Sequence, residues 1–227
     1  MLPYFGFHYG SQFFLSIINK ILKLAFLIFL IIGASSLITN LKADTKNDNF
    51  ANAVKAFNEK NYSSAVRLFE IEAQNFDFEA QYNLALLLKS GKGRPQDYSS
   101  ALFWSRIAQL SGLEQAKELA DEITEKISEK EIEPIINKIS KTIINRIDKG
   151  DTSAIPLLAA FYRDLLEETD FENAYIWYSI AVAFDIPETI KPRDEMEEKI
   201  EKDQLLKLQS KSNEIFKKIN DGKTISK

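Results

Sequence analysis

The stretch EAQYNLALLLKSGKGRPQDYSSALFWSRIAQLSGLEQA, residues 79–116, decides the fold of this chain. Two apolar runs flank a short loop, residues 91–97, which reads GKGRPQD. This pattern predicts a hairpin of two antiparallel helices, near 79–90 and 98–111. A single hairpin cannot bury both of its apolar faces, so we expect further copies to pack against it. Small residues recur where the helices would cross closely, with Trp104 among them: Ala80, Ala85, Ala101, Ala108 and Ala116.

The composition fits a folded helical chain and argues against several kinds of chemistry. Of 227 residues, 45% are hydrophobic and 27% are charged, whereas only 8 are Gly and 6 are Pro, which disfavours a sheet with many tight turns. Cysteine is absent, and the one histidine, His8, lies near the N-terminus. We therefore expect no disulfide, no metal, no cofactor and no Ser-His or Cys-His catalysis. An enzyme that uses carboxylates alone is the remote alternative.

The first 43 residues have the pattern of a leader. The run LAFLIFLIIGASSLI, residues 24–38, carries no charge and follows Lys20 and Lys23. A basic flank and an apolar centre of about fifteen residues predict a signal peptide, cleaved after Ala43. The alternative is an uncleaved membrane anchor, because residues 24–41 are just long enough to span a bilayer. In both cases the basic flank stays inside and the body is exported, to become periplasmic, secreted or anchored outside the cytoplasm. Membrane contact is then confined to residues 20–41.

The exported body is acidic. Residues 44–227 carry 26 basic and 33 acidic side chains, a net charge of −7. An acidic body has no electrostatic field to gather phosphates, so nucleic acid is not expected as a partner.

Helical periodicity continues through most of the body. We expect Asn61 to end a first helix in the left-handed conformation, and Ser63 and Ser64 to cap a second. Pro134 should sit in the first turn of its helix, and Pro192 should interrupt the pattern together with Pro187. The domain prediction is a leader at 1–43, a helical repeat body at 44–220 and a frayed tail at 221–227. The remaining helices are expected near 113–127, 131–149, 152–166, 171–184 and 203–219.

An internal repeat links two parts of the body. Trp104 and Trp177 are 73 positions apart, and the surrounding segments ALFWSRIA and AYIWYSIA match in the positions of their apolar and small residues. The leading helices match at a spacing of 74, as for Leu84 and Leu158, so one residue is missing from the second loop, where a deletion is cheap. Spacings of 36 also occur, which indicates a unit of about 36 residues, each one a helix pair.

At these residues the chain resembles Sel1-like repeats, relatives of the tetratricopeptide repeat. The departures from the family pattern are Ala85 for Gly, Leu88 for Tyr, Arg94 for Val and Gln109 for Ala, and the second copy lacks the loop glycines. The resemblance is strong over residues 77–116 and weaker over the rest of 48–200. The pattern is met by Ala80, Leu84, Gly91, Gly93, Asp97, Ala101, Trp104, Ala108, Gly112 and Ala116, and in the second copy by Ala154, Leu158, Tyr162, Asp170, Ala174, Trp177 and Ala181.

The resemblance implies an all-α, right-handed solenoid of about four helix hairpins with a C-terminal capping helix. It also implies an adaptor of the cell envelope that binds a peptide or partner protein. By analogy with related repeats, the amide of Asn83 is a candidate to bond a peptide backbone, and Lys92 and Arg94 form a basic loop on an acidic body. A structural arm of a membrane-tethered assembly is the alternative function, and a cell-wall-related enzyme the remote one. A cysteine-rich branch of the family is linked to β-lactam hydrolysis or binding, but this chain has no Cys.

Three other features have an ordinary structural interpretation beside a functional one. The Gly91 and Gly93 loop follows a helix, not a strand, which favours a helix stop over a phosphate cradle. The isoleucines of residues 132–147 are spaced as a core stripe, with a dimer face as the alternative. The acids of residues 122–133 alternate with lysines at helical spacing, which favours a solvated face over a metal site.

Overall fold

The structure, a computed structural model, describes residues 49–225, and no strand occurs in that range. The chain divides into two compact units, Met1–Ala51 and Asn52–Lys227, and nearly all of the described residues belong to the second. The predicted leader, and with it the choice between signal peptide and anchor, lies outside the described residues. No helix within residues 49–225 is both long and apolar enough to cross a membrane.

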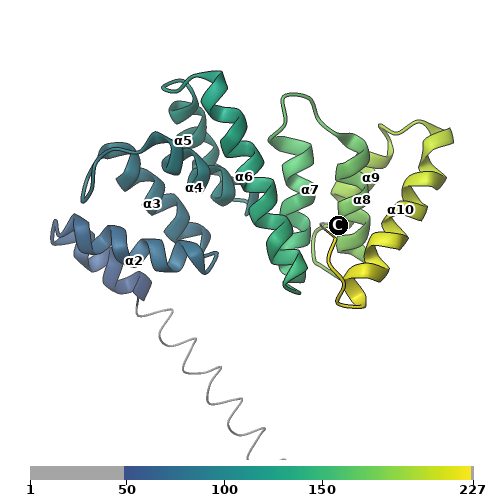
Figure 1. Cartoon of the computed structure of the whole chain (residues 1–227), viewed down its shortest axis with the longest axis horizontal. Helices are drawn as coiled ribbons and strands as arrows, with labels where there is room; N and C mark the ends of the chain where they lie inside the picture. The colour runs from purple at the N-terminus through teal and green to yellow at the C-terminus, as the bar shows by residue number, and fades with distance from the viewer. Residues whose placement is uncertain (1–48, 226–227) are drawn as a thin grey trace, which may run out of the picture. The chain divides into compact units, whose positions relative to one another are not determined.

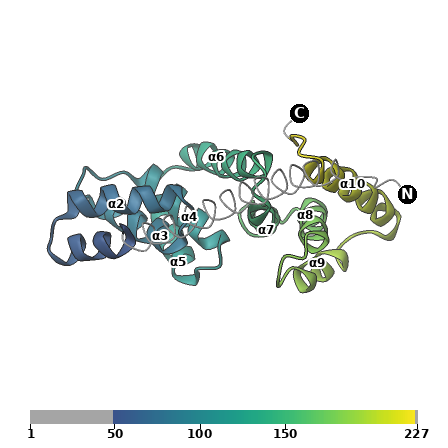
Figure 2. The same ribbon diagram turned by 90° about the horizontal axis from the view of Figure 1, so that it is seen from below.

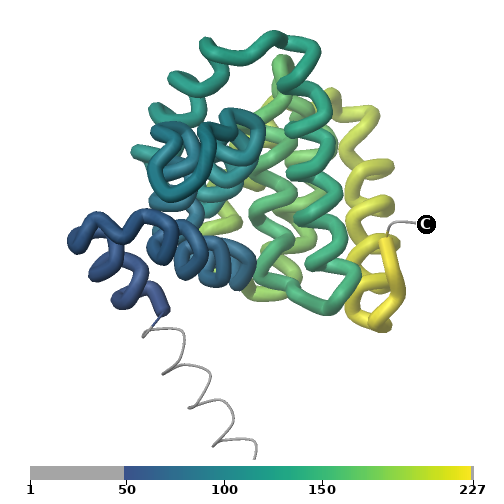
Figure 3. Tube along the Cα trace, turned by 60° about the vertical axis from the view of Figure 1, so that its left-hand side comes forward, coloured from purple at the N-terminus to yellow at the C-terminus, as the bar shows by residue number. Residues whose placement is uncertain are grey.

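The described part is a series of helices joined by short connections (Figure 1). Figure 3 shows that chain order is kept in space, from α2 and α3 in blue to α10 in yellow. Residues 49–58 are helical, and the short 3-10 turn η1 (Thr152–Ala154) precedes α7. The α-helices are α2 (Tyr62–Gln74), α3 (Phe78–Ser90), α4 (Tyr98–Leu110), α5 (Glu114–Thr124), α6 (Glu129–Asp148), α7 (Ile155–Asp164), α8 (Phe171–Ala183), α9 (Ile190–Glu197) and α10 (Lys202–Asn220).

Two antiparallel hairpins, α3–α4 and α7–α8, have the most extensive packing. Each is linked to its neighbours, α2 packing on α3 and α5 on α4 in the first, and α9 and α10 both packing on α8 in the second. The all-α class and the serial packing of helix hairpins predicted from the sequence are confirmed. The crossing points are filled by small residues that are wholly inaccessible to solvent: Ala80, Ala85, Ala101, Ala108, Ala154, Ala159, Ala174 and Ala181.

The segment between these hairpins does not form a third one. Helices α5 and α6 barely touch each other, and α6 packs instead against α4 and α7. The isoleucine stripe makes this contact, since Ile139 and Ile143 are fully buried and Ile135 and Ile147 nearly so. The stripe is therefore core, as its spacing favoured, and α6 bridges the two hairpins. Figure 2 shows α6 and α10 on one side of the α7–α8 pair and α9 on the opposite side.

The start of α2 differs from the prediction. The left-handed residue is Lys60, with φ of 61°, whereas Asn61 has φ of −82° and is the N-cap of α2. Its side-chain oxygen accepts a hydrogen bond from the backbone N–H of Ser64, so Ser63 and Ser64 lie within the first turn and do not cap it. Asn tolerates the left-handed conformation and is also a favoured N-cap, and here the cap prevails.

Two prolines also take positions other than those predicted. Pro134 is the sixth residue of α6, beyond its first turn, because a capping box of Ser128 and Glu131 starts the helix earlier. The missing N–H leaves the carbonyl of Lys130 without its helical partner, and Lys130 is exposed to water. Pro192 does not interrupt a helix but lies in the first turn of α9, where a proline is tolerated.

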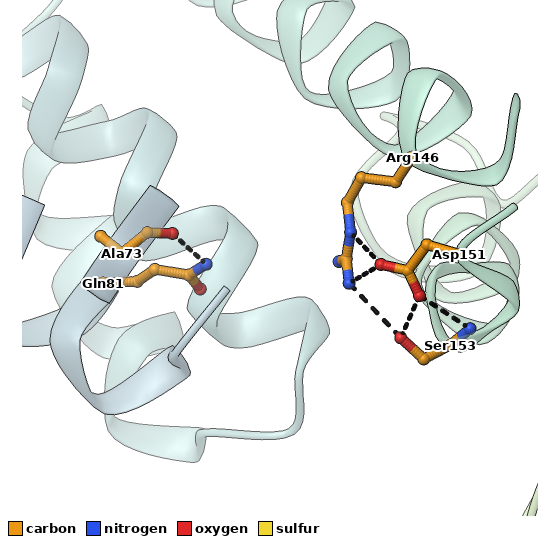
Figure 4. Close-up of polar contacts among 5 residues, drawn as sticks. All are labelled: Ala73, Gln81, Arg146, Asp151 and Ser153. Atoms are coloured by element: carbon orange, nitrogen blue, oxygen red, sulfur yellow. Dashed lines mark hydrogen bonds and ion pairs between the residues drawn. The ribbon is translucent and has the colours of Figure 1, made fainter. Parts of the chain in front are cut away.

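One buried and one partly buried polar contact join neighbouring elements (Figure 4). Gln81, fully buried in α3, donates from Nε2 to the carbonyl of Ala73 at 3.2 Å and so ties α3 to α2. Arg146 of α6 donates to Asp151 at 2.6 and 2.9 Å, and its guanidinium carbon lies 3.5 Å from the ring centroid of Phe76 in the α2–α3 turn. Partial burial opposes ionisation of Asp151, but bonds from Ser153 and Arg146 outweigh it and lower its pKa.

Candidate partner-binding loop between α3 and α4

The loop between α3 and α4 is closed by helix caps at both ends. Asp77 caps α3 through the N–H of Ala80 at 2.9 Å, and Gly91 ends the helix in the left-handed conformation with φ of 69°. Asp97 then caps α4 through the N–H of Ser100 at 2.9 Å. The backbone N–H of Asp97 also donates to the carbonyl of Leu88 at 3.1 Å, which closes the loop. These caps explain why the helix ends fell close to the positions predicted from the sequence.

Gly93 lies where no side chain fits. Its φ is 86°, and a Cβ built on it would stand 2.4 Å from the carbonyl oxygen of Tyr62 and 2.9 Å from the backbone nitrogen of Ser63. The hydroxyl of Ser63 donates to the carbonyl of Gly93 at 3.0 Å. The loop is thus seated on the first turn of α2, and its second glycine serves this close backbone approach.

Both basic side chains of the loop also contact α2. Lys92 is exposed, and its Nζ lies 5.3 Å from the ring centroid of Tyr62. Arg94 lies 3.5 Å from a carboxylate oxygen of Glu70. Partial burial opposes ionisation of Asp97, but bonds from Ser100 and the charge of Arg94 outweigh it and lower the pKa of Asp97. The basic loop therefore stabilises the stack of α2 on the α3–α4 hairpin, while its outer edge remains accessible.

Asn83 lies on α3 and is half-buried. Its side-chain nitrogen donates to the backbone carbonyl of Glu79, one turn earlier, at 2.8 Å. A peptide bound through this amide would have to compete with that bond. A role of Asn83 in partner binding remains a prediction.

The other residues of the repeat pattern lie mainly in the interior. Leu84 and Leu158 are fully buried at equivalent places in α3 and α7, and Gly112 follows α4 with φ of 92°. The two tryptophans differ, because Trp177 is 7% exposed whereas Trp104 is only half-buried. The ring of Trp104 lies edge-on to Phe103, with centroids 4.9 Å apart.

The acidic stretch between α5 and α6 is spread among separate contacts. Glu122 pairs with Lys89 of α3, and Glu131 accepts hydrogen bonds from Ser128. Those bonds lower the pKa of Glu131. Within residues 49–225, no three His, Cys, Asp or Glu side chains are grouped as a metal site would require.

The partners of the loop were not predicted from the sequence. Tyr62, Ser63 and Glu70 lie 24 to 30 positions before the loop residues they contact. A contact over that distance leaves no local pattern. The one available signal was the repeat itself, since stacked units place each loop beside the preceding helix.

Comparisons with known proteins show a similarity at the level of structure. No protein-family model and no curated protein matches the sequence. Among solved structures, the chain is similar to a protective antigen present in uropathogenic Escherichia coli strains, described as displaying an SLR fold. The match has 21% sequence identity and a TM-score of 0.37, and it covers 77% of this chain and 30% of that chain. The present chain thus spans less than a third of that protein's length.

Proposed function

We propose that this chain is a Sel1-like repeat protein that acts as a non-enzymatic adaptor in the cell envelope and holds a peptide or partner protein on the surface of its stacked helices. The observation that carries the proposal is the pair of equivalent hairpins, α3–α4 and α7–α8. Their crossing points are filled with alanine and leucine for stacking, and Gln81 and Ser105 are the fully buried polar side chains of these helices, so most of the remaining polar side chains are partly or fully exposed. Helices stacked in series offer an extended surface suited to a protein partner.

A pull-down from envelope extracts tests this proposal. The bait is the full-length protein in a non-ionic detergent, and the control is Leu84→Ala/Leu158→Ala, which opens a cavity in each hairpin. We expect one or a few proteins to be enriched by the wild type and depleted with the control. Recovery of the same background by both baits would contradict the adaptor proposal.

The alternative function, a structural arm of a membrane-tethered assembly, depends on the leader. Mass spectrometry of the mature N-terminus decides between the two. A start at Asp44 removes the tethered version, whereas an intact leader favours it. Turnover of a cell-wall substrate by the purified protein would instead support the remote enzymatic alternative.

A further inference from the structure

A groove of about 570 Å³ lies where α6, α8 and α10 meet. It exists because α7 packs between α6 and α8, which barely touch, while α10 packs directly on α8. Figure 2 shows α6 and α10 on the same side of the α7–α8 pair, and the residues that line the groove come from these helices and from Ile225. It lies away from the Gly91–Asp97 loop and is lined by none of its residues.

The groove has an apolar floor and a basic rim. One apolar side chain comes from each helix: Ile144 from α6, Trp177 from α8 and Ile215 from α10. Three lysines stand around them, Lys141 on α6 and Lys211 and Lys218 on α10. This concentration of positive charge is unusual on a body whose net charge is −7.

Two of the three lysines have no acidic partner in residues 49–225. Lys218 pairs with Glu214 at 3.0 Å, whereas neither Lys141 nor Lys211 forms an ion pair within that range. The one acid that lines the groove, Asp148, accepts the backbone N–H of Ile225 at 2.6 Å. The positive charges of Lys141 and Lys211 are therefore complementary to carboxylates of a ligand.

The chain's own C-terminal segment forms part of the groove wall through Ile225. Ile225 is half-buried there, and its hydrogen bond to Asp148 shows that the groove accepts a backbone and an apolar side chain together. Among residues 221–225 the one acid is Asp221, and it pairs with Lys223 at 3.0 Å. Residues 221–225 thus contribute the apolar side chain of Ile225 to the groove and no ion pair to Lys141 or Lys211.

We propose that this groove binds an acidic peptide segment of a partner protein, which places an apolar side chain on the floor and carboxylates against Lys141 and Lys211. Binding displaces Ile225, so the C-terminal segment acts as a weak internal competitor. This inference deepens the proposed adaptor function and rests on it for the identity of the partner, but the groove itself can be tested with synthetic peptides.

The test is a fluorescence titration of Trp104→Phe, in which Trp177 is the one tryptophan left in the chain. The probe is a capped peptide, Glu-Asp-Ile-Asp-Glu, added to the full-length protein at low salt. We expect saturable quenching or a shift of Trp177 emission, at least tenfold weaker binding in Lys141→Glu/Lys211→Glu, and weaker binding at high salt. The matched control Lys117→Glu/Lys207→Glu makes the same change of charge at exposed lysines outside the groove and should bind as before.

The tail supplies a second variant. Ile225→Ser should bind the acidic peptide severalfold more tightly, because the competing side chain is removed. Equal binding of Lys-Lys-Ile-Lys-Lys, or unchanged binding in the groove variant, would overturn the proposal. The proposal would also be overturned if no acidic peptide bound and Ile225→Ser lowered the melting temperature. The groove would then bind only the chain's own C-terminal segment. A concentration-dependent dimer lost in Lys141→Glu/Lys211→Glu would identify a second copy as the occupant and also overturn it.

The pull-down separates this proposal from the adaptor function. Captured proteins that are lost with Lys141→Glu/Lys211→Glu, but kept with Lys117→Glu/Lys207→Glu, support the groove as the docking site. Capture that is equal with both variants overturns the groove and leaves the adaptor function standing on another surface. Absence of capture by the wild type contradicts the adaptor function, while the peptide titration still decides the groove.

Discussion

The α3–α4 and α7–α8 hairpins close their loops in the same way with different sequences. In the first, the N–H of Asp97 donates to the carbonyl of Leu88 at 3.1 Å, and in the second the N–H of Asp170 donates to that of Tyr162 at 3.0 Å. Both aspartates cap the following helix at 2.9 Å, through Ser100 and Asn173. The ends of the loop thus determine the hairpin, and the sequence between them can vary.

The difference lies in what each loop packs against. Gly93 approaches the backbone of Tyr62 in α2, which leaves no room for a Cβ. The α7–α8 loop has no glycine, and Thr169 stabilises it by donating from its hydroxyl to the carbonyl of Arg163 at 3.1 Å. Gly93 of the first loop therefore serves the stacking of the loop on α2, whereas Gly91 serves the turn that ends α3.

The largest expected difference concerns the two equivalent tryptophans. Trp177→Ala should lower the free energy of unfolding by about 3–5 kcal/mol, because the ring is almost fully buried. Trp104→Ala should cost only about 1–2 kcal/mol, since Trp104 is less buried than Trp177 and its removal returns less buried apolar area to water. Chemical denaturation of the full-length variants measures both. Equal losses of unfolding free energy in the two variants would show that Trp104 and Trp177 stabilise their hairpins equally.

Gly93→Ala tests the difference between the loops. The new Cβ would meet the Tyr62 carbonyl at a backbone conformation unfavourable for alanine, so we expect a loss of about 2–3 kcal/mol. Glu167→Ala is the control, because Glu167 is an exposed residue at the matching point of the α7–α8 loop and should change stability by less than about 0.5 kcal/mol. A neutral Gly93→Ala would mean that the loop does not rest on α2.

The helix caps should behave alike in the two hairpins and give a smaller effect. Asp97→Ala and Asp170→Ala should each cost about 1 kcal/mol at pH 7. The charge of Asp97 adds a pH dependence. Because folding lowers its pKa, its contribution is complete above the ordinary value near 3.9 and is lost as pH falls through the folded value.

Asp97→Asn isolates that charge, since asparagine keeps a capping oxygen. Its deficit in unfolding free energy relative to wild type should be present at pH 7 and shrink toward pH 3. Denaturation series at the two pH values measure it. A deficit that stays constant with pH would contradict the lowered pKa.

The smallest expected effect concerns the ion pair of the first loop. Arg94→Ala should cost about 0.2–1 kcal/mol at low salt, because both Arg94 and Glu70 are partly exposed. The cost should fall at 1 M salt, where screening weakens the pair. Denaturation at the two salt concentrations measures it, and a cost above 2 kcal/mol would show that Arg94 does more than pair with Glu70.

The sequence predicted the hairpins well because their signals are local. Gly91 has a backbone role that few residue types can fill, and it ends α3 in the left-handed conformation, as the helix stop predicted for its loop requires. Prediction failed where two local options compete, as at Asn61, or where an earlier cap lengthens a helix, as before Pro134. In both places a local helix cap determined the outcome.

The loop contacts and the groove could not be predicted from the sequence for the same reason. Both are formed by residues that lie far apart in the chain. Residues 132–147 carried a clear stripe of isoleucines at helical spacing, but periodicity does not say which helices a stripe contacts. The structure places α6 between α4 and α7 instead of against α5. The groove exists because α6 packs in this way. Its lysines lie on α6 and α10, which are far apart in the chain.

Position-resolved photo-crosslinking in the native cell tests the adaptor account most directly. A photoreactive residue replaces Lys211 at the groove, Lys92 on the α3–α4 loop, or Lys207, which is exposed outside both. The account predicts a light-dependent adduct with a defined partner protein from Lys211 or Lys92, and none from Lys207. Absence of any adduct from all three positions, in cells where the protein is folded and exported, would contradict it.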